Sequence, residues 1–365
     1  MLAFFLPQFH PIPENDEWWG EGFTEWRNVA QARPRFPGHH QPHRPADLGY
    51  YDLRVPEVRE RQAELASEHG IDGFVWYHYW FSGRRLLQSP FEEVLATGQP
   101  NFPFAICWAN EPWTRAWDGA TGVTLMPQAY SPEDDVAHAR WLARAMADPR
   151  YLRLAGRPIV LVYRATQLPD ARRTTEVWRQ EIVRAGVTEP LIYRVEGPSG
   201  EEGDPTALGF DAAVEFQPYW TAFPRALRRT RLWFWSRRLH LTAPGYGRLK
   251  VFAYPDLVDR VASRPPVPWL RFPGVTPMWD NSPRRPTTGV VLVDSTPERY
   301  EAWLTVALKE AASIHGQGAV FINAWNEWGE GCHLEPDERH GRAYLEATRR
   351  AVTNSGVSQL ATPRW

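Results

Sequence analysis

Cysteine and long apolar runs are scarce in this 365-residue chain, and each scarcity excludes a class of protein. The two cysteines, Cys107 and Cys332, are too few for a disulfide scaffold in a chain of this size. No apolar run reaches about 18 residues, so no transmembrane helix is predicted. The apolar residues 1–6 are followed at once by Pro7 and are interpreted as a strand, not as a secretion signal. We therefore expect a cytoplasmic location, or a domain of a larger or exported protein.

Neither acidic nor basic side chains dominate, and standard phosphate-binding loops are absent. The chain has 41 Lys and Arg against 43 Asp and Glu, a net charge of −2, which argues against a whole-protein electrostatic footprint for nucleic acid. Without a glycine-rich phosphate loop, nucleotide binding is not expected. No Cys-x-x-Cys pair is present, and His39, His40 and His43 are interpreted as a solvated or backbone-bonded trio in one loop. The sequence therefore predicts neither a metal nor another cofactor.

Tryptophan, by contrast, is abundant. The chain has 19 Trp, 13 Tyr and 17 Phe, and singly such residues usually serve the core. Many of the tryptophans lie beside Asn, Asp, Glu or His, so that flat apolar faces and fixed polar groups occur together. This is the kind of pocket that a sugar ring requires. The tryptophans in polar surroundings are Trp18, Trp19, Trp26, Trp76, Trp80, Trp108, Trp113, Trp117, Trp325 and Trp328.

Eight short β-rich segments alternate with helical stretches, which predicts an α/β fold of the (β/α)8 TIM-barrel class. With 43% hydrophobic residues, the chain can bury a sizeable core as a single domain over residues 1–365, with an insertion at about 217–270. The predicted strands are Leu2–Leu6, Gly73–Tyr77, Phe104–Trp108, Pro158–Tyr163, Leu191–Val195, Ala212–Phe216, Thr276–Trp279 and Ala319–Ala324. The predicted helices are Pro56–His69, Pro132–Ala147, Thr174–Ala185, Pro297–Ile314 and Gly341–Val352.

Residues 225–250 depart from this alternation because they combine many basic side chains with aromatic ones and contain no acid. Such a segment could cover one side of the site, contact an anionic glycan or lie against a membrane surface. The alternative is an Arg-rich solvated insertion.

The segment 323–336 predicts the catalytic centre. Cleavage of a glycosidic bond commonly uses two carboxyl groups, one protonated and one ionised. Glu327 and Glu330 are three residues apart where a strand ends in a turn, so both can point into one pocket. The neighbouring Trp325 and Trp328 can supply the desolvation that raises the pKa of one carboxyl. A solvated pair on a helix face is the alternative, but the surrounding Trp, Gly and Asn show no helical apolar stripe.

Further polar and aromatic residues follow the predicted strands, where a TIM barrel carries its chemistry. Glu111, in an Asn-Glu-Pro segment after the third strand, is interpreted as a ligand for sugar hydroxyls, with a buried structural role as the alternative. The candidate substrate-binding residues are Glu25, Trp26, His78, Tyr79, Trp80, Trp108, Asn110, Glu111, Trp113, Asp118, Asp280, Asn281, Trp325, Asn326, His333 and Glu335.

The chain also resembles the WbsX-like proteins, whose domain is similar to glycoside hydrolase family 99. Long matching blocks carry the resemblance: LPQFHPIPENDEWWGEGFTEW (6–26), QPHRPADLGYYDLR (41–54), GIDGFVWYHYWFSGRRLL (70–87), FPFAICWANEPWTRAWDG (102–119), GFDAAVEF (209–216), RFPGVTPMWDNSPRR (271–285) and FINAWNEWGEGCHLEPD (321–337). The resemblance implies a (β/α)8 fold and a role in the metabolism of bacterial surface polysaccharide.

The similarity to family 99, which comprises retaining α-mannosidases and α-mannanases, also implies a mechanism. That family's Glu-Trp-His-Glu-Gly motif corresponds to residues 327–331 here, with Gly329 in place of the His. By position, Glu330 is implied to be the general acid/base. Glu327 is implied to withdraw the proton of the 2-hydroxyl, so that a 1,2-anhydro sugar forms as the intermediate. The departure at Gly329 affects contacts with the sugar.

The sequence thus favours a retaining glycoside hydrolase acting on α-linked surface polysaccharide, such as a mannan, rhamnan or O-antigen. Its expected partner is an oligo- or polysaccharide. Two other functions remain open: a glycosyltransferase or transglycosidase in polysaccharide assembly, and a catalytically silent glycan-binding barrel.

Overall fold

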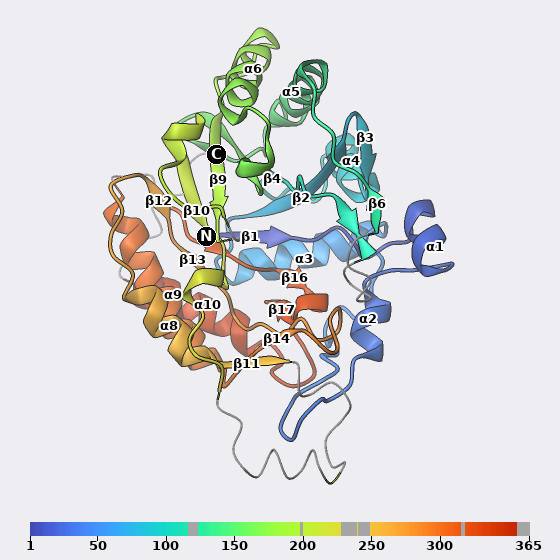
Figure 1. Ribbon diagram of the computed structural model, residues 1–365, viewed down its shortest axis with the longest axis vertical. Helices are drawn as coiled ribbons and strands as arrows, with labels where there is room; N and C mark the ends of the chain where they lie inside the picture. Colours follow the sequence, from blue (N-terminus) through green and yellow to red (C-terminus); the bar gives the residue numbers. More distant parts are fainter. Residues whose placement is uncertain (116–122, 198–199, 228–238, 240–248, 315–317, 356–365) are drawn as a thin grey trace.

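The computed structural model has parallel strands at its centre and helices around them, as Figure 1 shows. It describes residues 1–115, 123–197, 200–227, 239, 249–314 and 318–355. Most of the Arg-rich segment 225–250 and the predicted ligand Asp118 lie outside the described residues.

The parallel strands form a barrel that closes through residues 271–275, which confirms the predicted (β/α)8 fold. Around the barrel, neighbouring strands follow the order β12, β10, β9, β8, β4, β2, β1, β15 and β13. Because β12 pairs with β10 while β13 pairs with β15, these two short strands are halves of one seventh strand. The bounds are β1 Leu2–Phe5, β2 Gly73–Phe81, β4 Phe104–Trp108, β8 Arg157–Val162, β9 Leu191–Glu196, β10 Ala212–Glu215, β12 Arg271–Phe272, β13 Gly274–Val275 and β15 Phe321–Ile322.

The predicted seventh strand, Thr276–Trp279, is wrong in position, because the observed strand ends at Val275. Pro and Gly are typical of turns, so Pro273 and Gly274 favour a turn at this place in the sequence. The prediction therefore begins the strand after them, at Thr276. Pro273 separates β12 from β13, and the glycine serves a close backbone approach: a Cβ on Gly274 would overlap the carbonyl oxygen of Glu215. The other seven predicted strands are present: Phe104–Trp108 has the predicted bounds, and the remaining six have shifted ends.

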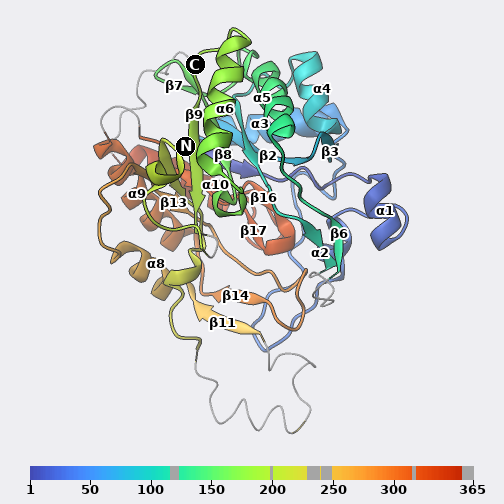
Figure 2. The same ribbon diagram turned by 45° about the horizontal axis from the view of Figure 1, so that its top comes forward.

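Helices surround the barrel, and several begin with the expected caps. The side chain of Ser131 accepts a hydrogen bond from the Asp134 N–H at the start of α5, and Thr296 accepts one from Arg299 at the start of α9. Figure 2 shows α5 and α6 on one side of the barrel, with α8 and α9 on another. The helices are α3 Pro56–Glu68, α4 Ser89–Thr97, α5 Pro132–Met146, α6 Ala171–Arg184, α8 Tyr254–Ala262, α9 Pro297–Ser313 and α10 Ala343–Asn354. Among the described residues, no helix combines the length and apolar character needed to cross a lipid bilayer.

The connections that leave the C-terminal ends of the strands contain additional short elements. They are α1 Pro13–Trp19, α2 Trp26–Gln31, β3 Arg84–Leu86, β5 Trp113–Thr114, β6 Thr124–Met126, β11 Lys250–Ala253, β14 Val290–Val293, β16 Asn326–Glu327 and β17 Cys332–His333. Strand β11 of the insertion pairs with β14. Both views place the β16–β17 hairpin between α10 and α2, with β14 and β11 beneath it.

Candidate active site

A cleft of about 490 Å³ lies at the C-terminal ends of the barrel strands. Aromatic rings and charged groups share its wall, which is the composition that a carbohydrate site requires. Its lining includes Gln8, Tyr77, Tyr79, Glu111, Trp113, Trp220, Asn281, Arg284, Arg285, Glu327 and Glu330. The cleft therefore brings together both predicted catalytic glutamates and four of the predicted ligands: Tyr79, Glu111, Trp113 and Asn281.

Arg284 forms ion pairs with three carboxylates in this wall. Its Nε lies 3.0 Å from Glu25 Oε1, its Nη2 lies 3.0 Å from Glu327 Oε2, and its Nη1 lies 3.1 Å from Glu330 Oε1. The side chains of Glu25 and Glu327 are 0% and 7% exposed, whereas that of Glu330 is 23% exposed toward the cleft. One buried cation cannot neutralise three carboxylates, so the cluster favours a bound proton.

The pKa values of both predicted catalytic carboxyls are raised. Burial is the main cause for Glu327, and the negative charges of Glu330 and Glu25 add to it, so that its pKa rises to about 8 although Arg284 opposes the shift. Burial also raises the pKa of Glu330, again against Arg284. Because the two groups interact, the pair titrates as a unit and retains a proton near neutral pH. The site can thus supply one protonated and one ionised carboxyl.

A tight hairpin holds the two glutamates. Glu327 ends β16, which pairs antiparallel with β17, and the turn between these strands is the 3-10 segment Trp328–Glu330. Gly331 closes the turn with φ 55°, a left-handed conformation that favours glycine. The N–H of Asp280 donates to the carbonyl oxygen of Glu330 at 2.7 Å, which joins the turn to the chain after β13.

Gly329 has a steric role in the same turn. A Cβ at this position would overlap Oε1 of Glu25 and lie 2.8 Å from Nε of Arg284. The space beside the turn is therefore filled by the Glu25–Arg284 ion pair and not by a side chain from the turn itself. This contact accounts physically for a glycine where the family 99 motif has a histidine.

A buried polar layer behind the hairpin orients Trp328. Glu335 Oε2 accepts hydrogen bonds from Tyr51 Oη at 2.8 Å and Trp328 Nε1 at 2.6 Å, and Glu335 Oε1 accepts one from Gln62 Nε2 at 2.6 Å. Burial raises the pKa of Glu335 to about 7, although these donors oppose the shift. Glu335 lies behind the cleft wall, so the structure gives it a supporting position and not contact with the substrate.

Two predicted ligands anchor backbone segments. Asn326 is fully buried and bonds to both N–H and C=O of Leu6, which fastens the hairpin to the end of β1. Asp280 Oδ2 is 2.6 Å from both His39 Nε2 and Gln41 Nε2. Burial alone would raise the pKa of Asp280, but these neighbours bring it below its usual value. Asn281 reaches the cleft, and its Oδ1 accepts a hydrogen bond from the Val290 N–H at 2.7 Å.

Comparison with known proteins shows the family and the fold. The family described as "Glycosyltransferase WbsX" matches residues 1–348. The chain belongs to the WbsX family. The uncharacterized protein WxcX of Xanthomonas campestris pv. campestris (strain B100) is 46% identical over 357 residues, which cover 97% of this chain and 50% of that protein. The WbsX-family chain thus spans about half the length of the curated relatives it matches.

Solved glycoside hydrolases share the fold. A GH99 endo-α-mannosidase from Bacteroides thetaiotaomicron has a TM-score of 0.54 at 15% identity, over 97% of this chain and 96% of that one. A glycoside hydrolase-like protein has a TM-score of 0.55 at 14% identity, over 88% and 92% of the two chains. At this identity, the likeness shows the fold alone.

Three predicted ligands point away from the cleft. Side chains alternate along a strand, so Tyr77 and Tyr79 of β2 face the cleft while His78 and Trp80 face the helices. His78 stacks on Trp141 of α5 with ring centroids 4.2 Å apart, and Trp80 stacks on His138 at 4.6 Å. Trp108 likewise packs on Trp178 of α6. The expected sugar contacts of His78, Trp80 and Trp108 are therefore corrected to packing between the barrel and its helices.

Trp26, Trp325 and Asn110 are likewise buried outside the cleft lining. Trp26 donates its Nε1–H to the Tyr51 carbonyl oxygen and packs on Trp328, and Trp325 packs on Phe74. Asn110 bonds to the backbone N–H and C=O of Arg164, which ties the end of β4 to the end of β8. Their predicted contact with substrate is corrected to a structural role, and Glu25 acts from behind Gly329 through Arg284.

Two arginines were missed by the sequence-based reasoning. Arg284 forms ion pairs with both predicted catalytic glutamates, and Arg285 also lines the cleft. Both follow Asp280 and Asn281 in the block after the seventh strand, where TIM barrels carry functional groups. That position was the available signal, although it could not distinguish an inward from an outward arginine.

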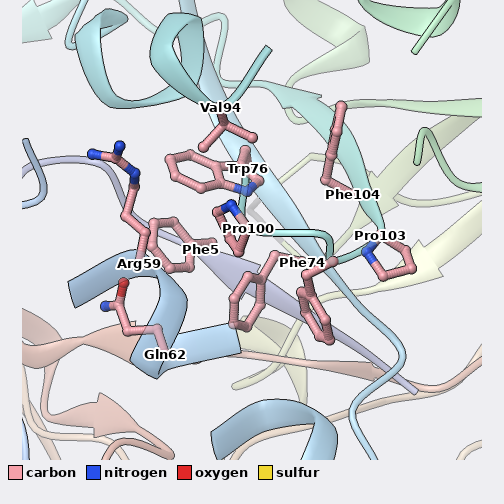
Figure 3. Close-up of a pocket in the computed structure, with 10 residues that line it drawn as sticks. Phe5, Arg59, Gln62, Phe74, Trp76, Val94, Pro100, Pro103 and Phe104 are labelled. Atoms are coloured by element: carbon pink, nitrogen blue, oxygen red, sulfur yellow. The ribbon is translucent and has the colours of Figure 1, made fainter. Parts of the chain in front are cut away.

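A second cavity is too small for a substrate. It lies among Phe5, Phe74 and Trp76 with Arg59 and Gln62 of α3 at one side, as Figure 3 shows. Its volume is about 10 Å³, which is roughly the space of one water molecule. The larger cleft is therefore the candidate active site.

The raised pKa of Glu327 makes stability depend on pH. The folded state keeps a proton that the unfolded chain releases above about pH 4.5, so the free energy of unfolding falls as the pH rises toward 8. Glu327→Gln removes the contribution of this carboxyl, while those of Glu330 and Glu335 remain. The variant should therefore be stabilised relative to wild type more at pH 8 than at pH 5, by a few kcal/mol in order of magnitude. Urea unfolding at both pH values measures the difference. Glu64→Gln, at an exposed side chain of α3, is the control. Equal effects of Glu327→Gln at the two pH values would contradict the raised pKa of Glu327.

The steric role of Gly329 predicts a coupling with Glu25. Gly329→Ala should lower the free energy of unfolding by about 1–3 kcal/mol, as overpacking does. The cost should shrink in a Glu25→Ala background, because the overlapping carboxylate is then absent. Urea unfolding of the four chains measures the coupling energy. A cost that is the same in both backgrounds would show that the contact does not explain the glycine.

Proposed function

We propose that this domain is a retaining glycoside hydrolase acting on α-linked bacterial surface polysaccharide. The observation that carries the proposal is the pair Glu327 and Glu330 in one cleft wall, bridged by the single guanidinium of Arg284. Raised carboxyl pKa values suit a pair that must both give and take a proton near neutral pH. The likeness to glycoside hydrolases in fold and the WbsX family membership support a glycan-active enzyme.

Each glutamate has one role in the proposed mechanism. The two carboxyls share one proton, and in the reacting form this proton lies on Glu330, the more exposed of the two, while Glu327 is ionised. Glu330 gives the proton to the glycosidic oxygen as the bond breaks. Glu327 takes the proton of the 2-hydroxyl, and O2 attacks the anomeric carbon to form the 1,2-anhydro sugar. Water then opens this ring: Glu330 takes a proton from the water, and Glu327 returns one to O2. Two displacements at the anomeric carbon retain its configuration.

Arg284 balances the charge of these steps. It contacts Glu327 and Glu330 through different nitrogens, so it can stabilise whichever of the two carries the negative charge. Tyr79 and Trp113, whose rings are 5.0 Å apart in an edge arrangement, provide the apolar surface for a sugar ring. Glu111 lies on the same cleft, held by Arg164 at 2.6 Å, and is placed to accept from sugar hydroxyls.

Transfer to a sugar acceptor is the second candidate, because the family is described as a glycosyltransferase. A transglycosidase would use the same first step, and an acceptor hydroxyl would replace water in the second. A transferase with a nucleotide-sugar donor would instead release nucleotide. A panel of nucleotide sugars, with free nucleotide as the readout, distinguishes this reaction from cleavage of polysaccharide.

The central prediction concerns product formation. Wild-type protein should release oligosaccharide from an α-mannan, a rhamnan or the producer's own surface polysaccharide, with NMR showing the retained anomer first. Glu330→Gln should lower the rate about 10²-fold or more, because the leaving oxygen loses its acid. Glu64→Gln is the matched carboxyl-to-amide control. An inverted first product would contradict the role of Glu327, and turnover by Glu330→Gln at the wild-type rate would contradict that of Glu330.

The pH profile of kcat/KM tests the charge cluster. Activity requires the shared proton, so kcat/KM should fall as the pH rises through the pKa of Glu327, about 8. Glu25→Gln keeps an oxygen for Arg284 but removes a negative neighbour that raises the pKa of both catalytic carboxyls. The alkaline limb should therefore move to lower pH in this variant. A limb that stays in place or moves upward would contradict the proposed coupling.

A further inference from the structure

A buried group of metal-ligand side chains lies behind the catalytic hairpin, outside the cleft lining. His43 comes from the long connection after β1, and His333 and Asp337 come from the chain at and after β17. The two segments are held together by backbone hydrogen bonds, from Ala46 N to Pro336 O and from Glu338 N to Arg44 O, both at 2.9 Å. The three side chains are thus brought together by regular backbone pairing and not by chance surface contact.

Their ligand atoms have nearly the spacing of a tetrahedral site. His43 Nδ1 lies 3.0 Å from His333 Nε2, and His333 Nε2 lies 3.8 Å from Asp337 Oδ2. All three ligand atoms lie within 4.8 Å of one another. Zinc bonds of about 2.0–2.2 Å at tetrahedral angles separate ligand atoms by roughly 3.3–3.6 Å. Side-chain shifts of a few tenths of an ångström up to about an ångström would therefore admit an ion.

Hydrogen bonds at the other polar atoms of His333 and Asp337 orient these side chains, as is common in metal sites. His333 Nδ1 is 2.9 Å from the carbonyl oxygen of Glu335. This oxygen can only accept, so the hydrogen of the neutral ring lies on Nδ1. The lone pair is then on Nε2, which faces His43 and Asp337. Asp337 Oδ1 accepts from the His340 N–H at 2.6 Å, so Oδ2 remains to bind. Ligating histidines and carboxylates in proteins are commonly held by such partners.

We propose that His43 Nδ1, His333 Nε2 and the Asp337 carboxylate bind a divalent ion of the zinc class. Two imidazoles and one carboxylate form a donor set that zinc accepts, and a fourth position is left for water. The ring of His40 lies next to His43, with the two ring centroids 5.1 Å apart.

The ion would have a structural role. The ring of His333 stacks on Trp328 with centroids 3.7 Å apart, and His333 pairs with Asn326 across the β16–β17 hairpin. Trp328 lies between the catalytic glutamates in sequence. An ion at His333 would thus fasten the connection that carries His43 to the hairpin that carries Glu327 and Glu330. The inference rests on this geometry and not on the proposed hydrolase activity.

Zinc binding to the purified chain tests the site directly. Protein freed of metal with a chelator and desalted is titrated with Zn²⁺ against a chromophoric chelator, and its thermal unfolding is followed with and without Zn²⁺. We expect one tightly bound ion per chain and a higher Tm with zinc. Asp337→Asn, which keeps the acceptor for the His340 N–H, should weaken binding at least tenfold and abolish the rise in Tm.

Two further variants complete the test. Glu338→Gln is the matched control, because Glu338 follows Asp337 directly and its side chain is exposed. This variant should bind zinc as wild type does. In His43→Gln, the side-chain amide can still donate a hydrogen bond to His333. This variant should weaken zinc binding as Asp337→Asn does, and it replaces Asp337→Asn in the test if that variant does not fold. Failure of wild-type protein to bind one equivalent of zinc, or binding by the folded Asp337→Asn or His43→Gln chain with wild-type affinity, would overturn the proposal.

Discussion

The buried guanidinium of Arg284 is the interaction on which the rest of the site depends. Glu25, Glu327 and Glu330 all lie within 3.1 Å of one of its nitrogens. Removing one partner of a buried ion pair leaves an uncompensated charge, which typically costs about 3–5 kcal/mol. Without this arginine, three closely spaced carboxyls would lose the cation that contacts all of them, and their protonated forms would be favoured further. The cation therefore permits two carboxyls to stay close together while one of them is ionised.

The backbone around this cluster follows from the same constraint. Gly329 leaves room for the Glu25 carboxylate, and Gly331 turns the chain sharply enough to place Glu330 beside Glu327. Behind them, the hydrogen bond from Trp328 Nε1 to Glu335 fixes the buried ring of Trp328. Much of the polar network in the 323–337 segment thus holds Glu327 and Glu330 in position behind the cleft wall.

The sequence predicts the barrel and the catalytic pair, because both depend on local signals. Alternating β-rich and helical segments specify the fold, and two glutamates among Trp and Gly after the last strand indicate a pocket. The direction of a side chain is harder to predict. Tyr79 and Trp80 are adjacent and equally aromatic, yet only Tyr79 faces the cleft. The partner of the glutamates, Arg284, comes from a connection more than 40 residues away, and only the closed barrel brings it to them.

In the proposed mechanism, hydrolysis and transglycosylation begin with the same attack of O2 on the anomeric carbon. The outcome depends on which hydroxyl reaches the anomeric carbon in the second step, and therefore on the acceptor side of the cleft. The loop after β4, with Glu111 and Trp113, and the chain after β10, with Trp220, form part of the cleft wall. Specificity for water or for a sugar acceptor would lie in these connections, which can vary while the Arg284 cluster stays the same.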